Sequence, residues 1–164
     1  MEATPPAVTV TPAAEFFDGW KGAAAFYHGV LTTDGPSRPV GRLAVQQALT
    51  MVGKPYSETF APPPGAFYCS SLVEWAYQQV YHASHVFVNF DFPLIFVPRS
   101  FWVDYYAKMN LTLPPPNTTG SNPTLLLHSE RVSFRRLVPP PACHSHRELR
   151  EGGQGAAAAR CVLV

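Results

Sequence analysis

The sequence predicts an α+β domain, in which short strands and amphipathic helices share one core. Three observations predict this class. A chain of 164 residues is long enough for a single core. Its residues are 46% apolar and only 14% charged, a composition typical of a folded chain with a buried core. Both hydrophobic patterns occur along it, the alternation typical of strands and the three- and four-residue steps typical of helices. Its 18 prolines favour long loops between these elements.

The first half of the chain predicts strands and helices in turn. Residues 7–11 alternate and are β-branched, as in a strand, and residues around 13–20 form a short helix. Residues 23–31 form a second strand. A helix over 42–52 has its apolar residues at helical spacing, namely Val45, Ala48, Leu49 and Val52. A further helix over 69–80 has one apolar face, made by Cys69, Leu72, Val73, Ala76 and Val80.

The second half is less regular. Residues 85–96 are rich in Val, Phe and Ile without a helical period, which predicts strands or an extended loop. Ser100 is a possible cap of a short aromatic helix over 101–109. One helical turn over 124–129 and a strand over 131–138 follow. Beyond Pro139 the core-forming pattern stops, so we expect one domain over 1–138 and a low-complexity, disordered tail over 139–164.

Charge and composition exclude several classes of protein. The formal net charge is +1, too small to attract nucleic acid strongly, so no nucleic-acid partner is expected. No apolar run approaches the length of a membrane span. The terminal Cys161-Val162-Leu163-Val164 fits the outline of a prenylation signal, but no second membrane signal supports it. The sequence leaves the cellular compartment open.

The three cysteines form neither a disulfide framework nor a zinc pattern. No cofactor or metal is predicted, although Cys143-His144-Ser145-His146 is a compact metal-capable cluster within the low-complexity tail. Cys69 stands apart from the other two because it begins a predicted helix. Unpaired amides and the dipole at a helix start favour a thiolate, which can act as a nucleophile. The competing interpretation is an inert core cysteine, since cysteine is among the most buried residue types.

A resemblance decides between these interpretations of Cys69. Three segments resemble, in the same order, the permuted papain-like amidases of the YaeF/YiiX group, relatives of NlpC-type cell-wall peptidases. They are Val52-Gly53-Lys54-Pro55-Tyr56, Phe67-Tyr68-Cys69-Ser70-Ser71-Leu72-Val73 and Gly120-Ser121-Asn122-Pro123. The resemblance implies a permuted papain-like (NlpC-type) fold, with Cys69 as the nucleophile of a thiol hydrolase.

The family also places a histidine-bearing strand before a strand that ends in Glu-Ala. Glu2-Ala3 is similar to that strand end, so Glu2 corresponds to the polar residue of the catalytic site. The histidine is then expected upstream of Met1, and the fold is expected to be incomplete at its N-terminus. Tyr56 and Tyr68, which flank the cysteine motif, are the predicted substrate-binding residues. A small amide, peptide or acyl-amide is the implied substrate.

Six histidines could stand in for the base, but none has a local signature. His28, in a strand-like aromatic run, is the best positioned. His82 and His85 stand three apart and could share a face, although a solvated helix end explains them equally well. The alternative function is a non-catalytic remnant or ligand-binding module of the same fold. A further alternative is a fragment that does not fold alone.

Overall fold

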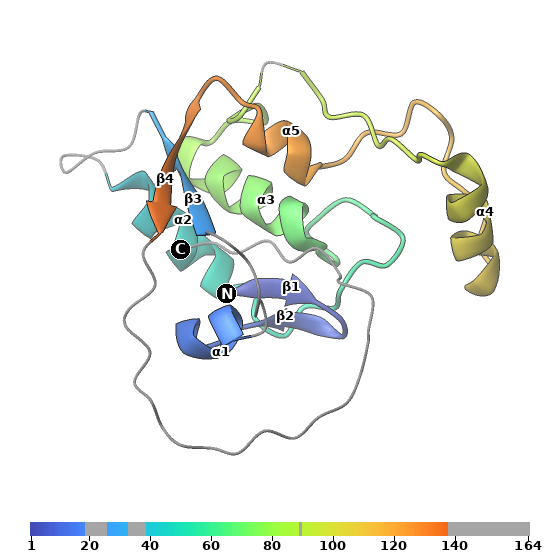
Figure 1. Ribbon diagram of the computed structural model, residues 1–164, viewed down its shortest axis with the longest axis horizontal. Coiled ribbons are helices and arrows are strands. Elements are labelled where there is room, and N and C mark those ends of the chain that lie inside the picture. Colours follow the sequence, from blue (N-terminus) through green and yellow to red (C-terminus); the bar gives the residue numbers. More distant parts are fainter. Residues whose placement is uncertain (19–25, 33–38, 89, 138–164) are drawn as a thin grey trace.

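The computed structural model describes residues 1–18, 26–32, 39–88 and 90–137 (Figure 1). Helices and strands are mixed, and α3 lies at the centre with the other elements around it. This architecture confirms the α+β prediction. In chain order the elements are β1 (Glu2–Thr4), β2 (Ala7–Thr9), α1 (Ala13–Asp18), β3 (Phe26–Leu31), α2 (Val40–Leu49), α3 (Cys69–Tyr81), α4 (Arg99–Lys108), α5 (Pro123–Leu127) and β4 (Val132–Leu137).

The strands form two separate antiparallel pairs. In the first pair, β1 and β2 form a hairpin in which Ala3 lies opposite Val8. In the second, β3 pairs with β4 from the far end of the domain, with Leu31 opposite Val132. Along the chain, β3 comes before and β4 after the helices α2 to α5. The second pair therefore joins an early and a late part of the described chain.

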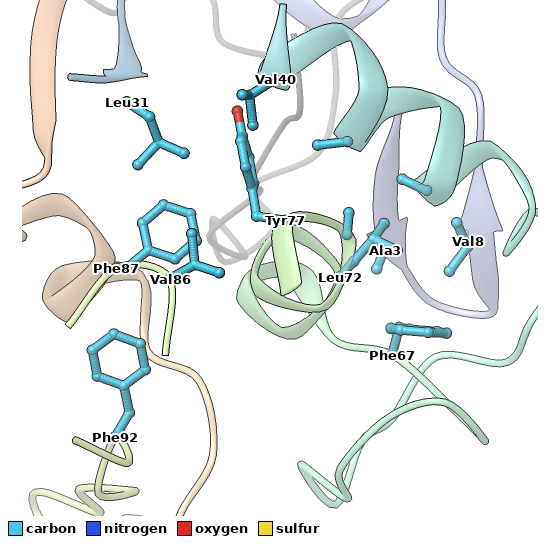
Figure 2. Packing of buried hydrophobic residues seen from close by; sticks show 13 residues of the cluster. Ala3, Val8, Leu31, Val40, Phe67, Leu72, Tyr77, Val86, Phe87 and Phe92 are labelled. Carbon is cyan, nitrogen blue, oxygen red and sulfur yellow. The ribbon is translucent and has the colours of Figure 1, made fainter. Parts of the chain in front are cut away.

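The core surrounds α3. Figure 2 shows α3 between two groups of side chains, with Ala3, Val8 and Phe67 on one side and Leu31, Val86 and Phe87 on the other. Leu72 and Ala76 of α3 are almost completely buried. β1 packs against α3 near the start of that helix, and α5 lies alongside it.

The packing of α2 differs from the sequence prediction. The predicted apolar face included Leu49 and Val52, yet these side chains are 46% and 48% exposed. Ala48 of the predicted face is buried and Val45 packs against the core, but the rest of the buried face is made by Val40 and Ala44. Small side chains spaced by four let α2 approach α3 closely, so the stripe with less bulk faces the core.

The end of α2 also lies earlier than predicted. The helix ends at Leu49, and Val52 belongs to a following turn in which amides bond to carbonyls three residues back. Gly53 then adopts a φ of +87°, which glycine tolerates because it has no Cβ. The predicted stop at this glycine is therefore wrong, because the helix ends three residues before the predicted end at Val52.

α4 begins two residues earlier than the predicted helix. Pro98 precedes its first residue, and Ser100 is the second residue of the helix, so the predicted Ser100 cap is wrong. Proline favours this boundary because its fixed φ suits the entry to a helix. The helix lies at one end of the molecule (Figure 1). Two tyrosine hydroxyls hold it there, Tyr105 donating to the Glu58 carbonyl (3.2 Å) and Tyr106 donating to the Thr59 carbonyl (2.9 Å).

The remaining predictions divide into confirmed and untested ones. The helix that begins at Cys69 is confirmed. No strand forms among the described residues of 85–96, which are loop apart from Pro93, in an isolated antiparallel bridge with Thr119. Within the described part of the chain, no helix is both long and apolar enough to cross a membrane. The predicted tail over 139–164 lies outside the described residues and stays a prediction.

Candidate active site

Cys69 is the first residue of α3, and its side chain is partly exposed. Tyr68, just before it, is extended, with φ −111° and ψ 170°. The Ser71 hydroxyl turns back onto this entry: it accepts from the Tyr68 amide (3.0 Å) and donates to the Tyr68 carbonyl (2.9 Å). These two bonds fix the direction in which the chain enters the helix, and so fix the position of the thiol.

A ladder of backbone hydrogen bonds leads from the first hairpin to the cysteine. The Val8 amide donates to the Lys54 carbonyl (2.9 Å), and the Gly53 amide donates to the Val8 carbonyl (2.9 Å). On the other edge of the segment 53–57, the Phe67 amide donates to the Pro55 carbonyl (3.0 Å). The first two segments of the family resemblance therefore lie side by side, next to β2.

Glu2 is buried beside this ladder. Only 4% of the surface of Glu2 is exposed, although a carboxylate usually stays in water. Its Oε1 accepts a hydrogen bond from the Thr11 hydroxyl, while its buried Oε2 has no hydrogen-bond partner among the described residues. The next residue, Ala3, packs in the same core as Leu72 of α3 (Figure 2). Glu2 and Cys69 therefore lie on two neighbouring elements.

Tyr68 lies in the interior, where only 2% of its surface is exposed. Its hydroxyl accepts a hydrogen bond from the Ser121 amide (2.5 Å). Burial raises the pKa of Tyr68 to about 12, partly offset by that hydrogen bond. The hydroxyl thus stays protonated, and Tyr68 joins the cysteine segment to the third resemblance segment.

Gly120 makes this contact possible. A Cβ at position 120 would lie 2.7 Å from the Tyr68 hydroxyl and 2.7 Å from a methyl carbon of Leu94, closer than real contacts allow. The resemblance singled out this glycine without giving it a role. Its role is steric, because only glycine lets the buried tyrosine come so close to the chain.

The sequence-predicted site residues come together only in part. Tyr56 is half-buried, and its amide donates to the Pro6 carbonyl (2.9 Å), which places it beside the first hairpin with Glu2 and the segment leading to Cys69. Tyr68 points instead toward Ser121. Sequence reasoning gave no site role to Glu74, or to Ser121 within the third resemblance segment, because only the fold shows that Glu74 is half-buried and Ser121 buried.

Two of the candidate histidines lie far from the thiol. His82 is the left-handed C-cap of α3, at the opposite end of a 13-residue helix. At 1.5 Å per residue, that helix separates His82 from Cys69 by about 20 Å. His85 follows it, and its Nε2 lies 2.9 Å from an Asp91 carboxylate oxygen. His82 is therefore not placed to deprotonate Cys69, and His85 is paired with Asp91 instead.

The other histidines give no closer candidate. His128 is exposed just after α5. His28 lies in β3 opposite Arg135, and its side chain is outside the described part of the structure. His144 and His146 lie outside the described residues.

Comparison with known proteins identifies the family. A family model described as a permuted papain-like amidase enzyme, YaeF/YiiX, C92 family, matches residues 1–96, more than half of the chain. This chain belongs to the permuted papain-like amidase family. The match includes Glu2, Tyr56, Tyr68 and Cys69. A search of curated protein sequences finds no match.

A solved structure agrees with this family and fold. The chain is similar to the crystal structure of the metalloprotein yiiX from Escherichia coli O157:H7, with a TM-score of 0.63 and 20% sequence identity. The similarity covers 82% of this chain and 72% of that one. At this level of identity, the likeness shows the fold, which is permuted papain-like.

The similar structure, yiiX, is described as a metalloprotein, which raises the question of whether this amidase-family chain has side chains that could hold a metal ion. No group of three or more His, Cys, Asp or Glu side chains that could hold a metal ion occurs within residues 1–18, 26–32, 39–88 and 90–137. The donor set of the described residues therefore does not fit a metal centre.

Proposed function

We propose that this permuted papain-like amidase acts as a thiol hydrolase, with Cys69 as its nucleophile. The observation that carries the proposal is the place of Cys69: it is the first residue of a capped central helix, inside the segment that the family model matches. The amides of the first helical turn have no partners within the helix, and they are suited to stabilising negative charge.

The chemistry has two steps. The Cys69 sulfur attacks the carbonyl carbon of an amide, the carbon–nitrogen bond breaks, and the amine leaves with a proton from the general acid. A thioester on Cys69 results. Water then attacks the thioester carbon, the carbon–sulfur bond breaks, and a carboxylic acid leaves while the thiol regains its proton. The first-turn amides of α3 are the proposed donors to the oxyanion in both steps.

Glu2 is the proposed orienting residue. A buried carboxylate that keeps one unpartnered oxygen can accept a hydrogen bond from an imidazole N–H. In papain-like chemistry, such a bond fixes the tautomer of the histidine that takes the thiol proton. We propose that an imidazole fills this position and is the general base.

The proposed substrate is a small amide, peptide or acyl-amide. The family description supports an amide bond as the target. Tyr56 is the proposed contact to the substrate, because it is half-buried on the edge of the ladder that leads to Cys69.

Reaction with iodoacetamide tests the nucleophile. The full chain is labelled at neutral pH, with and without denaturant, and each cysteine peptide is quantified by mass spectrometry. We expect rapid labelling of Cys69 in the native protein and none at that position in Cys69→Ser. The matched control is Cys143→Ser/Cys161→Ser, in which the labelling rate of Cys69 is expected to stay the same. Labelling of Cys69 only after denaturation would contradict the proposal and favour a non-catalytic ligand-binding module.

A further inference from the structure

A polar cavity lies on the side of α3 away from Cys69. Its volume is about 290 Å³. Ser71, Glu74 and Gln78 line it, and at 100° per residue these positions lie roughly opposite Cys69, Leu72 and Ala76. The far wall is made by residues 91–92 and 119–121, two segments joined by the Pro93–Thr119 bridge. The cavity is therefore separate from the proposed thiol site.

Acidic and unpaired polar groups face this cavity. Glu74 lines its wall, and Asp91, whose side chain is 71% exposed, lies at its mouth. Ser121 is 5% exposed, and its buried Oγ has no hydrogen-bond partner in the described residues. The Ser121 hydroxyl lies close to the Glu74 carboxylate, to which it can direct its proton. A hydroxyl also has two acceptor lone pairs, so its buried oxygen can still accept a hydrogen bond from a ligand in this cavity.

Aromatic rings provide the apolar part of the wall. Tyr68, Trp75 and Phe92 all line the cavity. Phe92 is 1% exposed and Tyr68 is tied to the Ser121 amide, so this wall is held in place. Rings next to carboxylates suit a ligand with a short apolar stem and a cationic head.

We propose that this cavity binds a primary alkylammonium group, with Glu74 and Asp91 as counter-charges and the Ser121 hydroxyl accepting one N–H. An ammonium carries three donors and no acceptor, which matches two carboxylates and one unsatisfied oxygen. The inference is independent of the proposed hydrolase activity. A metal ion is a poorer match, because no three metal-ligating side chains gather among the described residues.

Ionisation of the wall makes the binding depend on pH. Burial raises the pKa of Glu74 to about 6, an effect that Asp91 reinforces and that the nearby Ser121 hydroxyl and His85 partly offset. Glu74 is therefore ionised at neutral pH and protonated at pH 5. His85 contacts Asp91, the other proposed counter-charge. Protonation of Glu74 weakens binding as the pH falls.

Titration of the full chain with butylammonium at pH 7.5, followed by NMR chemical shifts, tests the proposal. We expect saturable binding, at least tenfold weaker binding in Glu74→Gln, and unchanged binding in Glu130→Gln, which removes an equal charge from an exposed position. The comparison ligands are 1-butanol, which has no charge, and tetramethylammonium, which has no N–H. Both should bind more weakly than butylammonium.

Several outcomes would overturn the proposal. These are the absence of saturable binding, equal affinity for 1-butanol or tetramethylammonium, and wild-type affinity in Glu74→Gln. Ser121→Ala is the second variant, and it should also weaken binding several-fold while the circular dichroism spectrum stays the same. Binding to His85→Gln should still weaken between pH 7.5 and 5. If that pH dependence is lost in His85→Gln, the assigned role of Glu74 is wrong.

Discussion

The two faces of α3 differ in what they bury. One face, with Leu72 and Ala76, packs against β1 and α2 and leaves almost no surface in contact with solvent. The other face, with Ser71, Glu74 and Gln78, borders a polar cavity. Cys69 lies at the start of the first face, so the proposed nucleophile begins an apolar, packed stripe, whereas the second face carries the ionisable group of the proposed ammonium site. Substitutions on the two faces should therefore have separable effects.

The largest expected difference between the faces is in catalysis. With a chromogenic amide that the protein hydrolyses, we expect Cys69→Ala to lower kcat/KM by about a thousandfold or more, because the nucleophile is lost. Glu74→Gln, on the other face, should keep a kcat within about threefold of wild type, because Glu74 is not part of the proposed thiol chemistry. An equal loss of amidase activity in both variants would contradict this separation and indicate that the two faces form one site.

The next difference is in stability. Leu72→Ala should lower the free energy of unfolding by about 2 to 5 kcal/mol, because it leaves a cavity in the core beside β1. Gln78→Ala, six residues along on the cavity face, should cost about 1 kcal/mol or less, since it loses one exposed hydrogen bond to the Ser84 carbonyl. Denaturant unfolding of both variants measures this. A wild-type chain without a cooperative transition would instead indicate a fragment that does not fold alone.

A smaller effect is expected where the cavity wall meets the cysteine segment. Gly120→Ala should cost about 1 to 3 kcal/mol, because its Cβ would overlap the Tyr68 hydroxyl and displace it from the Ser121 amide. Gly65→Ala is the matched control. A Cβ there meets nothing within 4 Å, so its effect on the midpoint of thermal unfolding should be close to zero. Equal effects at the two glycines would contradict the close packing of Tyr68.

The smallest effect concerns pH. Folding raises the pKa of Glu74 from 4.5 to about 6, chiefly through burial. The resulting stabilisation is present below pH 4.5 and is lost as the pH rises through 6, because the folded protein then holds a buried charge. Glu74→Gln should therefore gain stability relative to wild type between pH 4 and pH 8, by less than about 1 kcal/mol after solvent screening. Thermal melts of both proteins at pH 4 and pH 8 measure the difference in stability. A gain in the stability of Glu74→Gln at pH 4 alone would contradict a raised pKa of Glu74 in the folded protein.

The sequence predicted the parts of this protein that depend on local pattern. The helix that starts at Cys69 has a clear apolar stripe and was predicted to within one residue, and its motif also identified the family. The buried face of α2 was predicted only in part: Ala48 is buried as predicted, but close packing against α3 selects Val40 and Ala44 over the bulkier Leu49. That choice depends on the partner helix, which the periodicity of α2 does not describe.

Long-range contacts explain what the sequence could not predict of the site. The Tyr68 hydroxyl meets the Ser121 amide across 53 residues, and residues 119–121 line the same cavity as Glu74. The segment Gly120-Ser121-Asn122-Pro123 was singled out by resemblance, but its link to the cysteine segment required the fold. The roles of Glu2 and Cys69 in catalysis stay predictions.

The acyl-enzyme intermediate tests the central proposal, that Cys69 is the nucleophile, most directly. The native chain is mixed with an excess of an activated acyl ester, quenched in acid and digested, and the mass of the Cys69 peptide is measured. We predict that the acyl group is found on Cys69, that hydroxylamine removes it as expected for a thioester, and that Cys69→Ser does not form the thioester. Acyl transfer to other side chains with Cys69 unmodified would contradict this assignment.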